Sequence, residues 1–140
     1  MTHEKRMRRL RRSMMFLNAQ RPALIKDAYI YKPDSLMLDL EDAVAENQKD
    51  AARFSLYNAL KSVDYRGVER IVRINGLDTP HWQEDIRVTV AGRADGIRIA
   101  KCETPQDVLT VVEHIEKAEE EFGVEKGFTL VMAALESPLG

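Results

Sequence analysis

The apolar residues of the chain fall into short continuous runs, separated by longer segments in which apolar and polar positions recur with a helical period. A continuous apolar run bounded by turn residues indicates a strand buried on both faces, because a half-exposed strand would alternate polar and apolar side chains. Five such runs predict five strands, at residues 13–17, at the start of 35–44, and at 69–74, 95–100 and 129–135.

The segments between these strands carry apolar residues at intervals of three and four, as an amphipathic helix does. The clearest helix begins after Thr104, which suits the N-cap position, with Pro105 at the first helical position and Asp107 completing a capping box. Gly123 ends this helix. Helices are predicted at residues 23–31, 48–62, 81–90 and 105–122.

Strict alternation of strand and helix indicates an α/β fold with a parallel sheet and right-handed crossovers. Two architectures have this order, an open doubly wound sheet and a (β/α)8 barrel. A complete barrel needs about 250 residues, whereas the 140 residues here provide only four and a half strand–helix units. If the fold is a barrel, we expect it to be incomplete and the chain to be a fragment or a truncated product.

Composition and charge disfavour several classes of protein. The net charge of −2 argues against nucleic acid or an anionic membrane as the main partner. No apolar stretch approaches the roughly 18 residues of a membrane span. The single cysteine, Cys102, cannot form an internal disulfide, which favours a reducing compartment and a cytoplasmic location.

Residues 1–12 form a basic N-terminal arm, set apart from the domain predicted at 13–140. The arm carries six Lys and Arg side chains against one acid, Glu4. A contact with nucleic acid or phosphate is one interpretation. A solvated arm, or a short helix lying on the domain or on a partner, is the favoured one, because the whole chain is not basic.

Charged side chains gather where the predicted strands end. Parallel α/β folds place their chemistry at the carboxyl ends of the strands, so these side chains are the candidate site. They are Asp39, Glu41 and Asp42 at the end of the second strand, Arg73 at the end of the third, Arg98 and Lys101 at the fourth, and Glu136 after the fifth.

The carboxylates among them are hard oxygen ligands of the kind that Mg²⁺ prefers. Arg73 ends an apolar strand and needs an anion there, because an unpaired buried charge is costly. That anion is either Glu41 or Asp42 of the chain or a substrate carboxylate. Glu136 is likewise either a metal ligand or an ion-pair partner, whereas a structural ion pair is the favoured interpretation for Arg98 and Lys101.

Other chemistries lack their motifs. His3, His81 and His114 are scattered and do not have the spacing of zinc ligands. Ser137 is not in a GxSxG elbow, which disfavours a serine hydrolase. The turn after the first strand reads NAQRP, so the glycine-rich loop of a dinucleotide site is absent. We expect Cys102 to be a partly buried bystander.

Several segments together carry a resemblance to a known family. RRSMMFL, DSLMLDLEDAV, IVRINGLDTP, ADGIRIAK and AALESPLG occur in this order, and from Arg11 onward the chain resembles the citrate lyase β subunits of the HpcH/HpaI aldolase/citrate lyase superfamily. DLEDAV also recurs in the related malyl-CoA lyase-like enzymes. Members of the family usually have a VPG-like turn after the first strand, where this chain has NAQR.

The resemblance implies a (β/α)8 barrel of the TIM type, of which this chain supplies about the first half, five strands. It implies Mg²⁺ and the cleavage of a citryl thioester on an acyl carrier protein to oxaloacetate and an acetyl thioester. Arg73 falls on the substrate-binding arginine of the family, and Glu136 on the glutamate that binds metal and substrate. Asp39, Glu41 and Asp42 would hold metal-bound water or position Arg73. The family's second metal-binding carboxylate lies beyond the sixth strand.

The same resemblance implies α and γ subunits and a homo-oligomer as partners. The competing enzyme is a CoA-thioester lyase of the malyl-CoA or citramalyl-CoA type. An alternative that is not an enzyme is a truncated, non-catalytic subunit that acts in the assembly of a larger complex.

Overall fold

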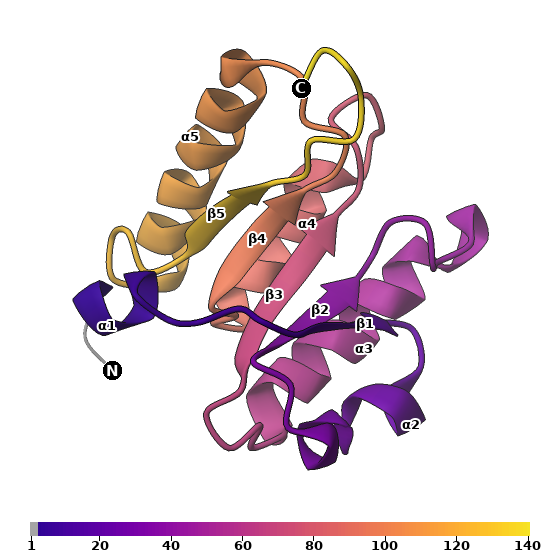
Figure 1. The fold of residues 1–140 in the computed structure, drawn as a ribbon. Helices are drawn as coiled ribbons and strands as arrows, with labels where there is room; N and C mark the ends of the chain where they lie inside the picture. Colours follow the sequence, from indigo (N-terminus) through magenta and orange to yellow (C-terminus); the bar gives the residue numbers. More distant parts are fainter. Residues whose placement is uncertain (1–2) are drawn as a thin grey trace.

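The computed structural model describes residues 3–140, apart from the side chain of His3. Five parallel strands form one sheet in the order of the sequence (Figure 1). All five predicted strands are confirmed. They are β1 (Met14–Asn18), β2 (Ser35–Asp39), β3 (Glu69–Ile74), β4 (Gly96–Ile99) and β5 (Leu130–Ala133).

Helices connect these strands. The α-helices are α1 (His3–Met7), α2 (Pro22–Ile25), α3 (Lys49–Ser62), α4 (Trp82–Ala91) and α5 (Pro105–Phe122), and two short 3-10 helices are η1 (Ala28–Tyr31) and η2 (Glu46–Gln48). The capping box of α5 is confirmed, with the backbone N–H of Asp107 donating to Thr104 Oγ1 at 3.2 Å and that of Thr104 donating to Asp107 Oδ2 at 2.9 Å. Gly123 ends the helix at a φ of 63°, which a glycine adopts without strain.

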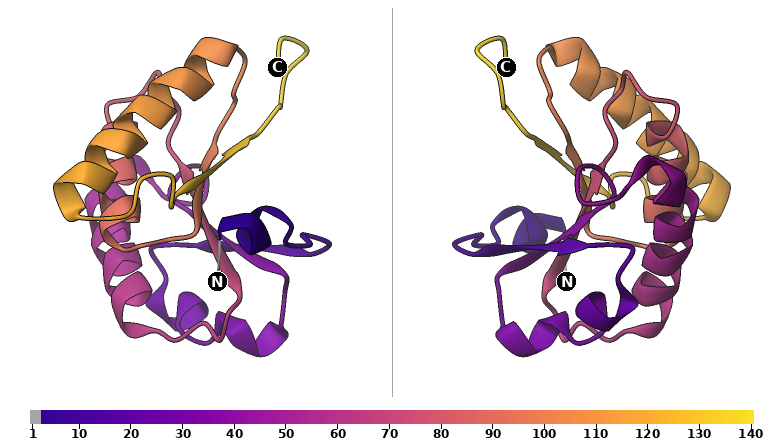
Figure 2. Two further views of the ribbon diagram at one scale, coloured as in Figure 1. Left: turned by 90° about the vertical axis from the view of Figure 1, so that its left-hand side faces the viewer. Right: turned by 90° about the vertical axis from the view of Figure 1, so that its right-hand side faces the viewer.

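The strand order and the helix positions distinguish the two α/β architectures. A doubly wound sheet has helices on both faces and a strand order that reverses at a switch point. Here the order does not reverse, and α3, α4 and α5 lie together on the convex face of the curved sheet (Figure 2). The chain therefore has the first five strands of a (β/α)8 barrel.

The hydrophobic core lies between the convex face and these three helices. Strand β2 is buried along its whole length, as the continuous apolar run predicts. Its side chains point alternately to the helices and to the concave face, which becomes the inside of a closed barrel. The core side chains from the strands are Leu36, Leu38, Val72, Ile74, Ile97 and Ile99, and those from the helices include Leu56, Ile86, Val111 and Ile115.

The helix predicted at 23–31 is wrong in its extent. The segment divides into α2 and η1, separated by Asp27 at φ −114° and ψ 10°, outside the α-helical region. The buried residues are Ile25 and Ala28, whereas Leu24 and Tyr31, which stand at helical spacing with Ala28, are exposed. Two short turns that each bury one side chain are enough to cover this end of the sheet, so no continuous helix forms.

The basic arm is fixed to the domain by its arginines. Arg6 donates hydrogen bonds to the carbonyl oxygens of Phe128 and Asp95, and its guanidinium lies 4.1 Å from the centre of the Phe128 ring. Arg11 forms a two-point ion pair with the buried Glu69, with N–O distances of 2.7 and 2.6 Å. These contacts agree with a short helix that lies on the domain. Within residues 3–140, no helix is long and apolar enough to cross a membrane.

Candidate functional site

Strand register brings three of the candidate residues, Asp39, Arg73 and Arg98, together on the concave face. One residue of each strand stands beside one of the next, in a line across the sheet that we call the cross-strand row: Asn18, Asp39, Arg73, Arg98 and Met132. Because paired residues of neighbouring strands point to the same face, all five side chains project into the concave side. The row lies towards the carboxyl ends of the strands, where barrel enzymes have their active sites.

Asp39 is the structural partner of Arg73. Its oxygens accept from Arg73 Nε and Nη2, both at 2.8 Å, and also from the backbone N–H groups of Glu41 and Ala43 at 2.9 and 3.1 Å. Burial alone would raise the pKa of Asp39, but the hydrogen bonds from Arg73 and from the backbone of Glu41 outweigh it, and the pKa is lowered. Asp39 is therefore an anion that fixes both the loop after β2 and the arginine of β3.

Glu41 and Asp42, which the sequence offers as partners of Arg73, are secondary ones. Arg73 Nη1 lies 3.3 Å from Glu41 Oε2 and 3.8 Å from Asp42 Oδ2. Glu41 is buried and also pairs with Lys101 at 3.0 Å, whereas the Asp42 side chain is 68% exposed. The hydrogen bond to Asp39 raises the pKa of Arg73, and that to Glu41 raises the pKa of Lys101. The structural interpretation of Lys101 is confirmed by its pairing with Glu41.

The loop after β2 is held from the helix layer as well. Lys49, the first residue of α3, is buried, and its ammonium group donates to the carbonyl oxygens of Leu40 and Glu41 at 2.9 and 2.8 Å. On the other side Asn18 donates to the carbonyl oxygen of Ala43 at 2.6 Å. Glu41 is thus placed by bonds from β1, β2 and α3 together.

A second buried ionic cluster, which the sequence analysis missed, holds the turn after β3. Asp85 of α4 is fully buried, and it accepts from Arg53 Nη1 at 2.9 Å and from the backbone and side-chain amides of Asn75 at 2.9 and 2.6 Å. Asn75 of the VRIN motif is therefore an anchor of the strand end rather than a group facing the row. The sequence feature that could have indicated this cluster is the position of Asp85, a carboxylate next to Ile86 on the apolar face of α4.

Glu136 lies on the segment that follows β5 and is exposed. The ladder with β4 continues to Ala134, which accepts from the backbone N–H of Cys102, and Ser137 then donates to Glu103 at 3.0 Å. Within the part of the chain that the structure describes, the Glu136 side chain forms no hydrogen bond or ion pair. The ion-pair interpretation of Glu136 thus has no partner among residues 3–140.

The carboxylates of the site offer few ligands for a metal ion. Among the described residues no three His, Cys, Asp or Glu side chains are arranged to hold one. Mg²⁺, however, usually takes only one or two protein carboxylates and completes its octahedron with water and substrate oxygens. Asp39 and Glu41 are engaged by cations, whereas Glu136 and Asp42 are exposed carboxylates.

The remaining candidates for metal or thiol chemistry do not join this site. His81 contacts Glu46, and His114 packs edge-on against Trp82 with 4.7 Å between the ring centres. Cys102 is 3% exposed, and burial raises the pKa of its thiol. The thiol is therefore protonated at neutral pH, which agrees with the bystander interpretation.

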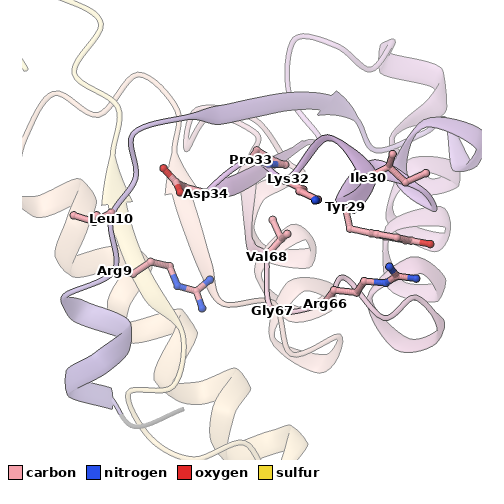
Figure 3. Close-up of a pocket in the computed structure, with 10 residues that line it drawn as sticks. All are labelled: Arg9, Leu10, Tyr29, Ile30, Lys32, Pro33, Asp34, Arg66, Gly67 and Val68. Atoms are coloured by element: carbon pink, nitrogen blue, oxygen red, sulfur yellow. The ribbon is translucent and has the colours of Figure 1, made fainter.

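A cavity of about 760 Å³ lies at the opposite end of the sheet, away from the row (Figure 3). It is bordered by the arm, by η1 and by the turn before β3, and the guanidinium of Arg66 lies 4.5 Å from the centre of the Tyr29 ring. A cavity of about 320 Å³ lies at the carboxyl end of the sheet, lined by Asp78, Lys101 and Glu103 among others. Position relative to the strand ends, rather than size, therefore selects the candidate site.

Comparison with known sequences gives one family. The family model described as HpcH/HpaI aldolase/citrate lyase matches residues 12–140. The citrate lyase subunit beta of Leuconostoc mesenteroides subsp. cremoris is 50% identical over 94% of this chain and 44% of its own length. A (3S)-malyl-CoA thioesterase of Cereibacter sphaeroides is 35% identical over 74% of this chain and 36% of its own. The chain thus spans less than half the length of these relatives.

The solved structures that resemble this chain include one of the same kind of protein as these sequence relatives. A citrate lyase beta subunit from M. tuberculosis, complexed with oxaloacetate and magnesium, superposes with a TM-score of 0.62 and 26% identity. The superposition covers 88% of this chain and 59% of that protein.

Proposed function

The chain belongs to the HpcH/HpaI aldolase/citrate lyase family, and we propose on this basis that it forms the first half of the catalytic barrel of a citrate lyase-type enzyme. The proposed reaction is the Mg²⁺-dependent cleavage of a citryl thioester to oxaloacetate and an acetyl thioester. The observation that carries the proposal is the fixed position of Arg73, in register beside Asp39 at the carboxyl end of the sheet. The identity of 50% with a citrate lyase subunit beta supports the choice of substrate.

Arg73 has the role of binding the substrate. Asp39 occupies the edge of the guanidinium formed by Nε and Nη2, and Glu41 lies 3.3 Å from Nη1, so an incoming carboxylate would share the second edge, formed by Nη1 and Nη2, with Glu41. Because Asp39 is also bonded to its own loop, it holds the guanidinium in one orientation. A cation that is oriented before the substrate arrives binds the substrate carboxylate, and so positions the reacting carbon, without reorganising during the reaction.

The proposed reaction breaks one carbon–carbon bond of the substrate. In the cleavage, the hydroxyl group on the central carbon loses its proton, and the bond from that carbon to the CH₂ of the thioester breaks. The electron pair passes to the thioester as an enolate, which is then protonated to the acetyl thioester, while the central carbon becomes the keto carbon of oxaloacetate. Arg73 would neutralise the carboxylate next to that carbon.

Glu136 would hold Mg²⁺ in this proposal, as an exposed carboxylate without a partner in the described part of the chain. When bound, the ion supplies Lewis-acid polarisation of the oxygen on the reacting carbon. Glu41 and Asp42 lie beside Arg73 Nη1, where they would position Arg73 or hold metal-bound water.

The partners belong to the same proposal. They are an acyl carrier protein or CoA as the thioester carrier, α and γ subunits, and further copies of the chain, in the cytoplasm. The 35% identity with a (3S)-malyl-CoA thioesterase favours a second candidate, a CoA-thioester lyase of the malyl-CoA or citramalyl-CoA type. A non-catalytic role in assembly is the third.

The experiment uses the native assembly, meaning the chain with whatever completes its barrel, purified from its source cells through a tag placed before Met1. Its intact mass is measured first, and cleavage is then followed with citryl and malyl thioesters, before and after Mg²⁺ is removed with EDTA. We expect Mg²⁺-dependent release of oxaloacetate from the citryl thioester. Cleavage of the malyl thioester alone would favour the second candidate. An inactive assembly that contains only a 16.0 kDa chain would favour the third.

A further inference from the structure

Arg98 is the one member of the cross-strand row whose charge the other described residues do not neutralise. It stands beside Arg73 in the register of β3 and β4, so both guanidinium groups lie on the concave face. Across residues 3–140, no carboxylate pairs with Arg98. Its Nη1 reaches only the sulfur of Met132, at 3.8 Å, and its Nε is buried without a hydrogen-bond partner.

The neighbours of Arg98 do not supply a counter-ion. Asp39 is saturated by Arg73 and by backbone N–H groups, and Glu41 is shared between Arg73 and Lys101. The Phe16 ring lies 5.9 Å from the guanidinium of Arg98 and 5.2 Å from that of Arg73. An aromatic face attracts a cation weakly but does not cancel its charge. The favoured sequence interpretation, a structural ion pair for Arg98, thus has no partner in the described part of the chain.

A half-buried arginine with an unsatisfied donor is energetically costly unless an anion comes to it. Arg73 and Arg98 stand on neighbouring strands, which are about 4.8 Å apart. This separation is on the scale of the distance between the two end carboxylates of a short dicarboxylate. Two arginines placed side by side, one already held by an internal acid and one not, suit a ligand with two carboxylates.

We infer that Arg98 binds the second carboxylate of the substrate, the one that becomes the CH₂-carboxylate of oxaloacetate. The inference rests on the proposed function and deepens it. Arg73 takes the carboxylate next to the reacting carbon, and Arg98 takes the distal one. A malyl thioester yields a keto acid that lacks this second carboxylate, so Arg98 would be a specificity-determining residue that favours the citryl thioester.

The test compares two ligands that differ only in the second carboxylate, oxaloacetate and pyruvate. Their dissociation constants are measured by calorimetry on the native assembly with Mg²⁺ present, for the parent and for Arg98→Met. Methionine fills a similar volume next to Phe16 and Met132. We expect oxaloacetate to bind roughly 10- to 100-fold more weakly to the variant, the loss of a charge-assisted hydrogen bond, and pyruvate to change by less than about threefold. In turnover, KM for the citryl thioester should rise more than kcat falls.

Controls separate the possible outcomes. Arg87→Met removes an exposed arginine of α4, far from the row, and should change neither constant. Arg98→Lys keeps the charge without the planar fork and should fall between parent and Arg98→Met, and it replaces Arg98→Met if that variant fails to fold. Suppose that the parent releases oxaloacetate, but that Arg98→Met binds both ligands as the parent does or loses affinity for both equally. The proposed role of Arg98 is then wrong, and the proposed function stands. If the parent neither binds oxaloacetate nor cleaves the citryl thioester, both fail.

Discussion

Asp39 and Arg73 form a two-point ion pair across the neighbouring strands β2 and β3, with both N–O distances at 2.8 Å. The pair is almost shielded from water, since the side chains are 3% and 12% exposed. The pair is at once structural and functional in the proposed enzyme, because the acid that neutralises the arginine also fixes the orientation of its guanidinium.

Arg73→Ala should abolish turnover. The variant removes the cation that faces the substrate carboxylate, and a rate loss of about 10²- to 10³-fold or more is expected from the loss of one preorganised charge. The measurement is kcat for oxaloacetate release by the native assembly, with Arg87→Ala as the control. The far-UV circular dichroism should be retained. Near-normal activity in a folded variant would remove Arg73 from the site.

Asp39→Asn should destabilise the fold in a pH-dependent way. The variant keeps the shape of the side chain but leaves Arg73 without its charged partner, at a cost of about 3 kcal/mol at neutral pH. Because the pKa of Asp39 is lowered from 3.8 in the folded protein, its stabilisation is present above pH 3.8 and is lost as the pH falls through the folded value. Urea unfolding of parent and variant should therefore give a difference that is constant near neutrality and shrinks in acid. A difference independent of pH would contradict the ion pair.

Glu136→Gln should weaken Mg²⁺ binding by the native assembly without weakening the fold. The side chain is exposed and forms no ion pair within the described residues, so the substitution breaks no contact that stabilises this part of the fold. A loss of at least about tenfold in affinity corresponds to roughly 1.4 kcal/mol. Titration calorimetry with Mg²⁺ measures it, and Glu120→Gln on the exposed face of α5 is the matched control. An unchanged titration would exclude Glu136 as a ligand.

Asp85→Asn should be strongly destabilising, although Asp85 belongs to the helix layer and is not part of the cross-strand row. It breaks the fully buried pair with Arg53 and weakens the anchor of Asn75, and we expect a loss of about 3–5 kcal/mol in the free energy of unfolding. Equilibrium unfolding in urea measures the loss. Asp50→Asn is the control, because Asp50 contacts Arg53 from an exposed position. Equal effects of the two variants would show that burial of the pair does not matter.

The sequence predicts the strands well because their apolar runs are local signals. The capping box of α5 is local too, since Thr104 and Asp107 lie within one helical turn. The segment 23–31 fails because its apolar spacing is compatible with one helix or with two short turns. Only the shape of the sheet it covers decides between these two structures.

The sequence indicates that charged side chains gather at the strand ends, but it does not indicate how they pair. Asp39 rather than Glu41 holds Arg73 because the register of β2 and β3 puts the two directly opposite each other. Register depends on how distant parts of the chain align, and the spacing of charges along the sequence does not contain it. For the same reason, the lack of a partner for Arg98 emerges only once β4 is placed between β3 and β5.

The bonds from Lys49 to the carbonyl oxygens of Leu40 and Glu41 have a consequence for the order in which the site forms. Every backbone N–H from Glu41 to Val44 is bonded within the loop after β2, yet that loop is fastened by a residue of the outer helix layer. The loop therefore becomes protected from hydrogen exchange only when α3 has docked, and the two behave as one cooperative unit. Loosening of the first turn of α3 would release Glu41 on the other side of the sheet.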